Sequence, residues 1–238
     1  MPVIERPPER GPANRPREWA AMTYPIQLVL KGRKCVVVGG GKVAARKVAA
    51  LRRAGGDVHV ISPEFDEELQ ARQDITRHVG HYQPGLLVGA SLVLICTNDP
   101  VVNAAAAADA RAAGALVNVA DTPALCDFYV PAVVHRGPIQ IAIGTGGASP
   151  ELSATLRRVV EGAIPDAYAE LADALRRVRP IVKQRIPAQA DRSRFFAALC
   201  GDESVKRFMT EGPTSWWAWF EHLLAQAAGR STEDTRPL

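Results

Sequence analysis

The sequence lacks any long hydrophobic run. No apolar stretch reaches the roughly 18 residues that a membrane-spanning helix requires. The N-terminus also lacks the apolar core of a secretion signal. We therefore expect no membrane segment and a cytoplasmic protein.

Cysteines and aromatic residues are also scarce. The four cysteines lie far apart without a Cys-x-x-Cys pair, which argues against a disulfide framework or a zinc knuckle and favours a reducing compartment. Aromatic residues make up 6% of the chain, and the net charge of +4 is spread along it, so nucleic-acid binding has little support. The five histidines show no ligand spacing, and we predict no resident metal.

The 238 residues suggest one large domain or two small ones, at about 150 residues per domain. Residues 1–22 are rich in proline and arginine with little apolar pattern, which predicts a disordered tail. From residue 23 to residue 120, short apolar runs alternate with helical patterns. Because a parallel crossover needs a helix, this alternation predicts an α/β fold with a Rossmann-type parallel sheet. We expect strands over 34–38, 58–61, 75–79, 92–96 and 116–119, and helices over 41–53, 64–72 and 99–114.

The alternation stops after residue 120. Two β runs, Phe128–Val134 and Ile139–Ile143, are joined by the turn-like residues His-Arg-Gly-Pro, so residues 121–148 are predicted to form a small β segment. Residues 149–238 have helical patterns and are predicted to form a helical domain, in which Ser149 caps the first helix. Helix stops are expected near Pro180, Pro187, Gly201 and Gly212-Pro213.

A glycine motif directly follows the first predicted strand. In VVVGGGKVAARK, Gly39 permits a tight turn, Gly41 lets the backbone approach a pyrophosphate, and Ala44 allows close packing of helix on strand. The N-terminus of the following helix offers unpaired N–H groups to phosphate oxygens. The spacing of strand, turn, helix and second strand predicts a dinucleotide site.

The residues expected around that cofactor leave its identity open. Ser62 occupies the position where an acidic residue would reject a 2′-phosphate and an arginine would welcome one. Glu64 is close enough in sequence to reach the ribose, which favours NAD over NADP. Thr97 and Asn98 follow the most apolar strand and should face the cofactor, because ligands bind at the carboxyl ends of parallel strands. Asp99 next to them also suits a helix cap.

Asp121 lies just past the last predicted strand, at the same edge of the sheet. This position suits a general base beside the nicotinamide. It equally suits a turn-capping aspartate before Thr122 and Pro123. Position alone does not choose between these two interpretations.

Three segments together resemble a known family. They are YPIQLVLKGRKCVVVGGGKVAARK, LICTNDPVVN and NVADTPALCDFYVPAVVHRGPIQIAIGTGGASPELSATLR. Their order, and the combination of GGGxVAxRK, NVxD and GGxSP, resemble precorrin-2 dehydrogenases, which occur alone or as the N-terminal module of sirohaem synthases. The resemblance extends from about residue 24 to residue 160 and continues more loosely through the helical tail.

The resemblance implies an enzyme that oxidises precorrin-2 to sirohydrochlorin with NAD⁺, as a homodimer that uses residues 121–148 for contacts. Some members also insert Fe²⁺, and the sequence does not decide whether this chain does. No methyltransferase module follows here, which predicts the stand-alone form. Asp121 matches the acid of NVxD that the family implicates in catalysis. The positions that match NAD contacts in the family are Lys42, Val43, Pro63 and Glu64.

The expected substrate carries several carboxylates, so an anion site is also predicted. The loop Gly144–Ala148, followed by a helix N-terminus, forms an anion-binding concavity. Thr145 stands where some family members have serine, which keeps a hydroxyl there. The predicted substrate-binding residues are Thr145, Gly146, Gly147 and Ser149. An ordinary capped helix entry would look the same in sequence.

Two functions of other kinds remain as alternatives. One is another NAD(P)-dependent oxidoreductase that acts on a small anionic substrate. The other is a regulatory module that binds NAD without chemistry, although a sensor needs no proton acceptor at residue 121. An anaerobic assay with precorrin-2 would separate them.

Overall fold

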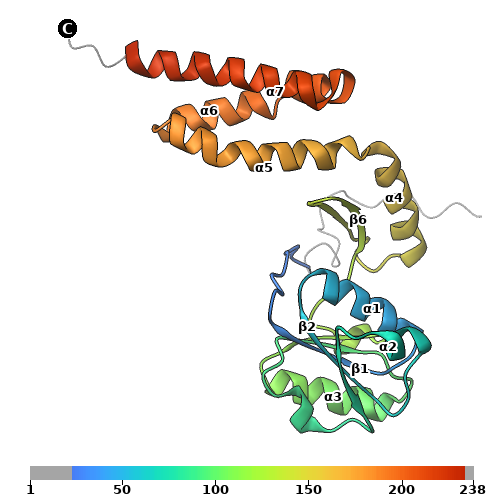
Figure 1. The fold of residues 1–238 in the computed structure, drawn as a ribbon. Coiled ribbons are helices and arrows are strands. Elements are labelled where there is room, and N and C mark those ends of the chain that lie inside the picture. The colour runs from blue at the N-terminus through green and yellow to red at the C-terminus, as the bar shows by residue number, and fades with distance from the viewer. Residues whose placement is uncertain (1–22, 234–238) are drawn as a thin grey trace, which may run out of the picture. The chain divides into compact units, whose positions relative to one another are not determined.

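The computed structural model describes residues 23–233, so the predicted tail over residues 1–22 lies outside the described residues. The chain forms two compact units, one ending at Val130 and the other beginning at Pro131. Figure 1 shows the elements of each unit. The four cysteines are free thiols. No helix in the described part of the chain is long and apolar enough to cross a membrane.

The first unit contains a five-stranded parallel sheet in the order β3-β2-β1-β4-β5. This is the Rossmann strand order 3-2-1-4-5-6 without its sixth strand, and the order of the strands reverses between β1 and β4. The predicted Rossmann-type sheet is therefore confirmed. The strands are β1 (Lys34–Val38), β2 (Asp57–Ser62), β3 (Thr76–Val79), β4 (Leu92–Ile95) and β5 (Leu116–Val119).

Helices cover both faces of this sheet (Figure 1). On one face lie α1 (Lys42–Arg53) and α2 (Glu67–Ala71). On the other face lie α3 (Pro100–Ala112) and the short 3₁₀ helix η2 (Pro84–Leu87). A second 3₁₀ turn, η3 (Pro123–Leu125), follows β5. The predicted helix over 64–72 is shorter than expected because Asp66 caps α2 and fixes its start at Glu67.

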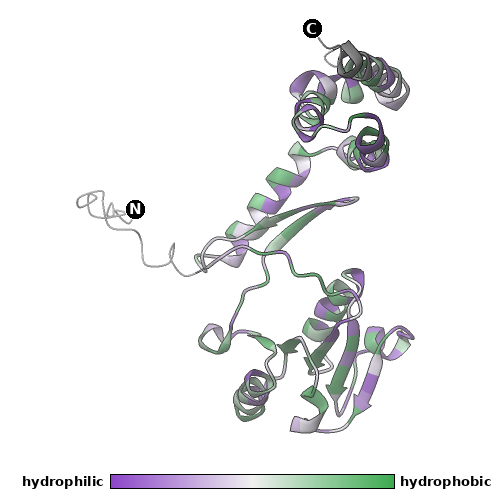
Figure 2. Ribbon diagram, turned by 90° about the vertical axis from the view of Figure 1, so that its left-hand side faces the viewer, coloured by the Kyte–Doolittle hydropathy of each residue, from purple (hydrophilic) through white to green (hydrophobic). Residues whose placement is uncertain are grey.

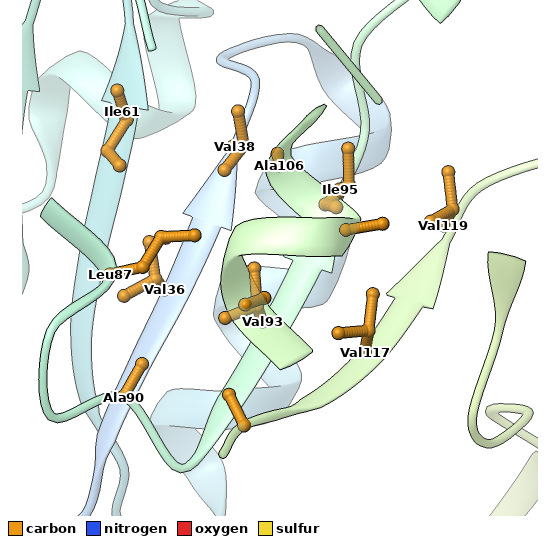
Figure 3. Packing of buried hydrophobic residues seen from close by; sticks show 13 residues of the cluster. Val36, Val38, Ile61, Leu87, Ala90, Val93, Ile95, Ala106, Val117 and Val119 are labelled. Carbon is orange, nitrogen blue, oxygen red and sulfur yellow. The ribbon is translucent and has the colours of Figure 1, made fainter. Parts of the chain in front are cut away.

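The two-sided burial explains the apolar strands. All four residues of β4 are buried, and the central strands of the sheet are largely hydrophobic in Figure 2, whereas the edge strand β3 is mostly polar. Figure 3 shows the core on the α3 face, where Val36, Val93 and Val117 from three strands pack in one layer. Ala106, buried on α3, is small enough to let the helix approach the strands closely.

The second unit begins with an antiparallel hairpin of β6 (Ala132–Arg136) and β7 (Ile139–Ile143). The predicted start of the first strand at Phe128 is wrong by four positions. Pro131 precedes β6 and has no N–H to donate to a ladder, so the strand starts after it. The hairpin turn is also tighter than predicted, since Arg136 pairs with Ile139 and only Gly137 and Pro138 lie between them. Gly137 has a φ of 53°, which two-residue hairpin turns commonly require.

Four helices complete the second unit: α4 (Pro150–Ala163), α5 (Ala167–Arg185), α6 (Gln189–Leu199) and α7 (Asp202–Glu233). The predicted stop at Pro180 is wrong, because α5 continues through it. Val178 and Val182, on either side of Pro180, are both fully buried, and their packing outweighs the local cost of proline. The stop predicted at Gly212 and Pro213 appears as a kink in α7, where Gly212 has a φ of 83°.

Candidate active site

The glycine turn after β1 is built on close backbone approach. Gly39 has a φ of 116°, and a Cβ added there would lie 2.7 Å from the Cys96 carbonyl oxygen. A Cβ on Gly40 would lie 2.0 Å from the Glu64 carbonyl oxygen and 2.6 Å from the Ser62 Oγ. The turn is therefore wedged between the ends of β4 and β2. Gly40, which the sequence analysis did not single out, is the most tightly packed of the three glycines.

Gly41 has a different environment from its two neighbours. A Cβ on Gly41 would meet no atom within 4 Å, so its surroundings are open. Gly41 is also the N-cap of α1 and supplies no side-chain hydrogen bond, and the first turn of α1 has no acidic residue. The space beside Gly41 is therefore open at a helix end that carries a partial positive charge. Lys42 and Val43, the first two residues of α1, are exposed.

A groove of about 530 Å³ lies beside this turn, past the end of β2. Two of the predicted cofactor residues, Pro63 and Glu64, line it and are exposed. Ser62 is 7% exposed, and its side chain packs against Gly40, so it supports the glycine turn. The remaining lining residues are Phe65, Gln70, Arg77 and Val79.

Arg77 is held against the backbone at the rim of this groove. Its Nη1 donates to the carbonyl oxygens of Leu69, at 2.9 Å, and Arg72, at 3.1 Å. It also donates to the Gln70 carbonyl oxygen at 2.5 Å. These contacts tie β3 to the end of α2 and keep the guanidinium in one place.

The residues after β4 form a hydrogen-bonded cap for α3. The Asp99 carboxylate accepts from the backbone N–H groups of Val101, at 2.8 Å, and Val102, at 3.2 Å. The Thr97 Oγ1 lies 2.6 Å from Oδ1 of the buried Asn103. The capping interpretation of Asp99 is thus confirmed. Thr97 is half-buried in this network, whereas the neighbouring Asn98 is exposed.

The segment that carries Asp121 is folded back along β5. Its backbone is held by bonds from the Asp127 N–H to the Val117 carbonyl oxygen at 2.8 Å, and from the Val117 N–H to the Asp127 carboxylate at 2.9 Å. The Val119 N–H donates to the Cys126 Sγ at 3.2 Å. Asp121 itself is exposed at the carboxyl end of the sheet. The loop is therefore tethered to β5 by hydrogen bonds, and Asp121 remains exposed.

Asp121 also has an uncommon backbone conformation. Among the described residues it is the only non-glycine residue with a positive φ, at 56°. Such a conformation costs most residues roughly 1–2 kcal/mol, and aspartate and asparagine tolerate it best. Strained residues of this kind cluster at functional sites.

A lysine from α1 reaches the same edge of the sheet. The Lys47 Nζ donates to the Asn118 Oδ1 at 3.3 Å. Asn118 is 7% exposed, and its Nδ2 donates to the Phe128 carbonyl oxygen at 2.9 Å. Burial raises the pKa of the nearby Cys96 thiol to about 11, while the Lys47 charge lowers it and the Asp121 charge raises it. The two opposite charges therefore act on the same sulfur atom.

The loop predicted to bind the substrate lies in the second unit and is closed by its own hydrogen bonds. The Thr145 Oγ1 donates to the Ser149 carbonyl oxygen at 3.1 Å. The Ser149 Oγ accepts from the Leu152 N–H at 3.2 Å and donates to the Glu151 carboxylate at 2.7 Å, which lowers the pKa of Glu151. The predicted cap at Ser149 is thus confirmed. Gly146 and Gly147 are exposed and offer backbone rather than side chain.

The first unit brings the glycine turn, the Glu64 groove, Thr97 and Asp121 to the carboxyl ends of its strands. Three further residues lie there that the sequence patterns did not indicate: Gly40, Lys47 and Asn118. Lys47 lies in the GGGxVAxRK motif and Asn118 in NVxD, so motif membership was the only available signal. Between residues 23 and 233, no three His, Cys, Asp or Glu side chains gather as a metal site would require.

Comparison with family models assigns both units. Residues 26–132 match the model described as putative NAD(P)-binding. Residues 136–163 match the model described as sirohaem biosynthesis protein central. The first match covers the whole parallel sheet, and the second covers β7 and α4.

The curated relatives are larger proteins. The chain is 42% identical over 177 residues to the sirohaem synthase of Nitrosomonas eutropha, covering 73% of this chain and 37% of the relative. It is 44% identical over 165 residues to the sirohaem synthase of Nitrosococcus oceani, covering 68% of this chain and 35% of the relative. The chain thus spans little more than a third of the length of these relatives.

A solved structure supports the fold. The structure described as SirC, precorrin-2 dehydrogenase, matches with a TM-score of 0.68 at 22% identity, covering 84% of this chain and all of that one. The two family models, the relatives and this fold agree on one assignment. The chain therefore combines a domain of the putative NAD(P)-binding family, over residues 26–132, with a segment of the sirohaem biosynthesis protein central family, over residues 136–163.

Proposed function

We propose that the chain oxidises precorrin-2 to sirohydrochlorin, with NAD⁺ as the hydride acceptor and Asp121 as the general base. The observation that carries this proposal is the coincidence, at one sheet edge, of a glycine turn with open space at Gly41 and a strained, exposed carboxylate at Asp121. The similarity to sirohaem synthases and the fold shared with a precorrin-2 dehydrogenase name the substrate class.

The residues present fit a dinucleotide. The N–H groups of the first turn of α1 suit a pyrophosphate, because Gly41 leaves room for its close approach. We expect Thr97 and Asn98, at the end of β4, to line the same crevice, because ligands bind at the carboxyl ends of parallel strands. NAD⁺, when bound, accepts the hydride that the oxidation removes from the substrate.

The groove at the end of β2 favours NAD over NADP. Glu64 lines the groove and would repel a 2′-phosphate while accepting a hydrogen bond from a ribose hydroxyl. Arg77 is the basic residue in the groove lining, and its Nη1 is already shared among three carbonyl oxygens. We expect Glu64→Arg to weaken NAD⁺ binding and to strengthen NADP⁺ binding. Unchanged affinities for both dinucleotides would remove Glu64 from the ribose site.

The protein supplies proton removal and substrate orientation. Asp121 lies on a tethered loop and is exposed, which suits a residue that accepts the proton that leaves with the hydride. The loop of the second unit, through the backbone of Gly146 and Gly147, is proposed to contact a substrate carboxylate. The hydroxyls of Thr145 and Ser149 shape this loop through their internal hydrogen bonds.

An anaerobic assay tests the proposed function directly. Precorrin-2 is incubated with the protein alone, with NAD⁺ and with NADP⁺, and sirohydrochlorin is followed by absorbance. We expect turnover with NAD⁺ and little with NADP⁺. A parallel arm with Fe²⁺ as substrate reports whether sirohaem is formed. Tight NAD⁺ binding without precorrin-2 turnover would instead identify a regulatory module or an oxidoreductase of another anionic substrate.

We also propose that the protein is a homodimer. On α4, Leu152, Leu156 and Val159 fall at helical spacing and are 47%, 38% and 64% exposed. An apolar stripe of this kind on a helix without a buried residue is typical of an association surface. Light scattering of the wild type and of a Leu156→Glu variant tests this, with dimer and monomer expected respectively. A monomeric wild type would contradict the proposal.

A further inference from the structure

Lys47 occupies an unusual position on α1. The buried residues of this helix include Ala44, Val48 and Leu51, so Lys47 lies at the margin of the face that packs on the sheet. An apolar residue would be expected there on packing grounds alone. Its side chain instead extends to Asn118 on β5, at the edge of the sheet where ligands bind.

Asn118 is arranged to hold an ammonium group. Its Nδ2 donates to the Phe128 carbonyl oxygen at 2.9 Å and lies 3.5 Å from the Cys126 Sγ, which fixes the orientation of the amide. The amide oxygen is thereby turned toward Lys47. Because Asn118 is nearly buried and its amide Nδ2 already has two partners, its side chain is held in place independently of Lys47.

Lys47 has no oppositely charged partner among the described residues. Within residues 23–233, the Nζ forms no salt bridge and only one hydrogen bond, the 3.3 Å contact with a neutral amide. An ammonium has three donors, so two remain for a ligand. Asn118, near the end of β5, and Asp121, just past it, lie at the same carboxyl edge, and the charges of Lys47 and Asp121 both act on the pKa of the Cys96 thiol.

We propose that Lys47 is a substrate-binding residue whose ammonium, supported by Asn118, binds a carboxylate of the tetrapyrrole beside Asp121. This inference rests on the proposed function and deepens it. A polycarboxylate substrate that approaches Asp121 is repelled by it, and a cation nearby offsets that repulsion. Asn118 is then a positioning residue, because it acts through Lys47.

The test uses the full chain and two variants of the same site. Lys47→Met removes the charge and keeps most of the aliphatic stem, whereas Lys47→Arg keeps the charge. Arg53→Met, at the exposed C-terminal end of the same helix, is the matched control for loss of one positive charge. Each protein is titrated with uroporphyrin, a stable polycarboxylate porphyrin, and with NAD⁺, and the KM for precorrin-2 is measured at low and high salt.

We expect Lys47→Met to weaken uroporphyrin binding and to raise the KM for precorrin-2 by about 10- to 100-fold, the range for loss of one charge-assisted hydrogen bond. The salt dependence of KM should decrease, and the Kd for NAD⁺ should stay within about twofold of the wild type. Lys47→Arg should restore most of the affinity. Arg53→Met should behave as the wild type. A lysine that only ties α1 to β5 would alter thermal stability without altering these affinities.

Several outcomes would overturn the inference. A folded Lys47→Met variant with wild-type KM and porphyrin affinity refutes it while leaving the proposed function intact. A loss of NAD⁺ affinity by the same factor would assign Lys47 to the cofactor phosphates and refute it as well. Lys47-dependent porphyrin binding without precorrin-2 turnover supports the carboxylate site and refutes only the proposed reaction. A wild type that neither binds the porphyrin nor turns over precorrin-2 refutes both.

Discussion

The glycine turn offers a pair of substitutions that separates ligand binding from folding. Gly41 has a φ of −85° and ψ of −175°, which alanine adopts without strain, and its added methyl meets no protein atom within 4 Å. Alanine is a poorer N-cap than glycine, so we expect Gly41→Ala to lower the free energy of unfolding by no more than about 1 kcal/mol. The same methyl would occupy the space that a pyrophosphate needs. Loss of one or two charge-assisted hydrogen bonds, about 3 kcal/mol, predicts NAD⁺ binding weaker by about 100-fold.

Gly40→Ala is the matched variant, in which the added methyl meets protein atoms rather than open space. Its added Cβ would lie 2.0 Å from the Glu64 carbonyl oxygen, whereas a relaxed C···O contact is about 3.3 Å. The loop after β2 must therefore move by about 1.3 Å, and because the obstacle is backbone, no side-chain rotation relieves it. We expect a loss of about 2–3 kcal/mol in the free energy of unfolding. Affinity for NAD⁺ should fall as well, since Glu64 lines the groove.

Chemical denaturation and calorimetric titration of the two variants decide the question. The expected pattern is a stable Gly41→Ala protein that binds NAD⁺ weakly and an unstable Gly40→Ala protein. A Gly41→Ala protein with wild-type NAD⁺ affinity would show that the turn is a structural feature only. The assignment of the dinucleotide site, and with it the role of Asp121, would then fail.

Three further predictions concern other parts of the chain. Asp121→Asn introduces a side chain that tolerates a φ of 56° but cannot act as a base. Turnover should therefore fall by at least about 100-fold, while NAD⁺ affinity and the free energy of unfolding stay unchanged. A normal rate would end the catalytic assignment. Burial, together with the charges of His59 and Lys34, lowers the pKa of His78 in the folded protein. Below about pH 6.5 the unfolded chain therefore binds this proton more readily than the folded one, and the free energy of unfolding should decrease. His78→Gln should flatten this dependence in denaturation curves, and parallel curves would contradict the reasoning. In the second unit, the fully buried Trp216 donates from Nε1 to the Ser204 Oγ at 2.8 Å. Trp216→Phe should lower the free energy of unfolding by about 2–4 kcal/mol, because it leaves both a cavity and an unpaired hydroxyl. A decrease below about 1 kcal/mol in calorimetry would refute this.

The parallel sheet could be predicted because its strands carry a strong local signal. A run such as Leu92–Ile95 is apolar at every position, and it is buried on both faces. The glycine turn could be recognised for a similar reason, since Gly39 and Gly41 stand at fixed positions between a strand and a helix. Local chemistry was sufficient where each element is determined by its own residues.

The helical unit was harder to predict because long-range packing decides its boundaries. Pro180 predicts a helix stop, yet Val178 and Val182 bury themselves against the rest of the unit and α5 continues. The start of β6 at Ala132 also depends on a distant partner, because Ala132 pairs with Ile143, the last residue of β7. Periodicity indicates that a helix or strand exists, but it does not show whether tertiary packing outweighs the local destabilisation by a residue such as Pro180.

The candidate site shows the same division. Asp121, Glu64 and Gly41 could be named from sequence because each stands directly after a strand. Lys47 could not, because its partner Asn118 is 71 positions away and the side chain crosses from a helix to a strand.

The two sequence interpretations of Asp121, turn residue and base, are also not exclusive. Its positive φ restricts the position to glycine, asparagine or aspartate at low cost, and of these three only aspartate is a proton acceptor. A turn alone would be satisfied by asparagine or glycine. The combination of this conformation with a carboxylate, with Lys47 held by Asn118 and with an open glycine turn at the same edge favours chemistry over a purely structural role.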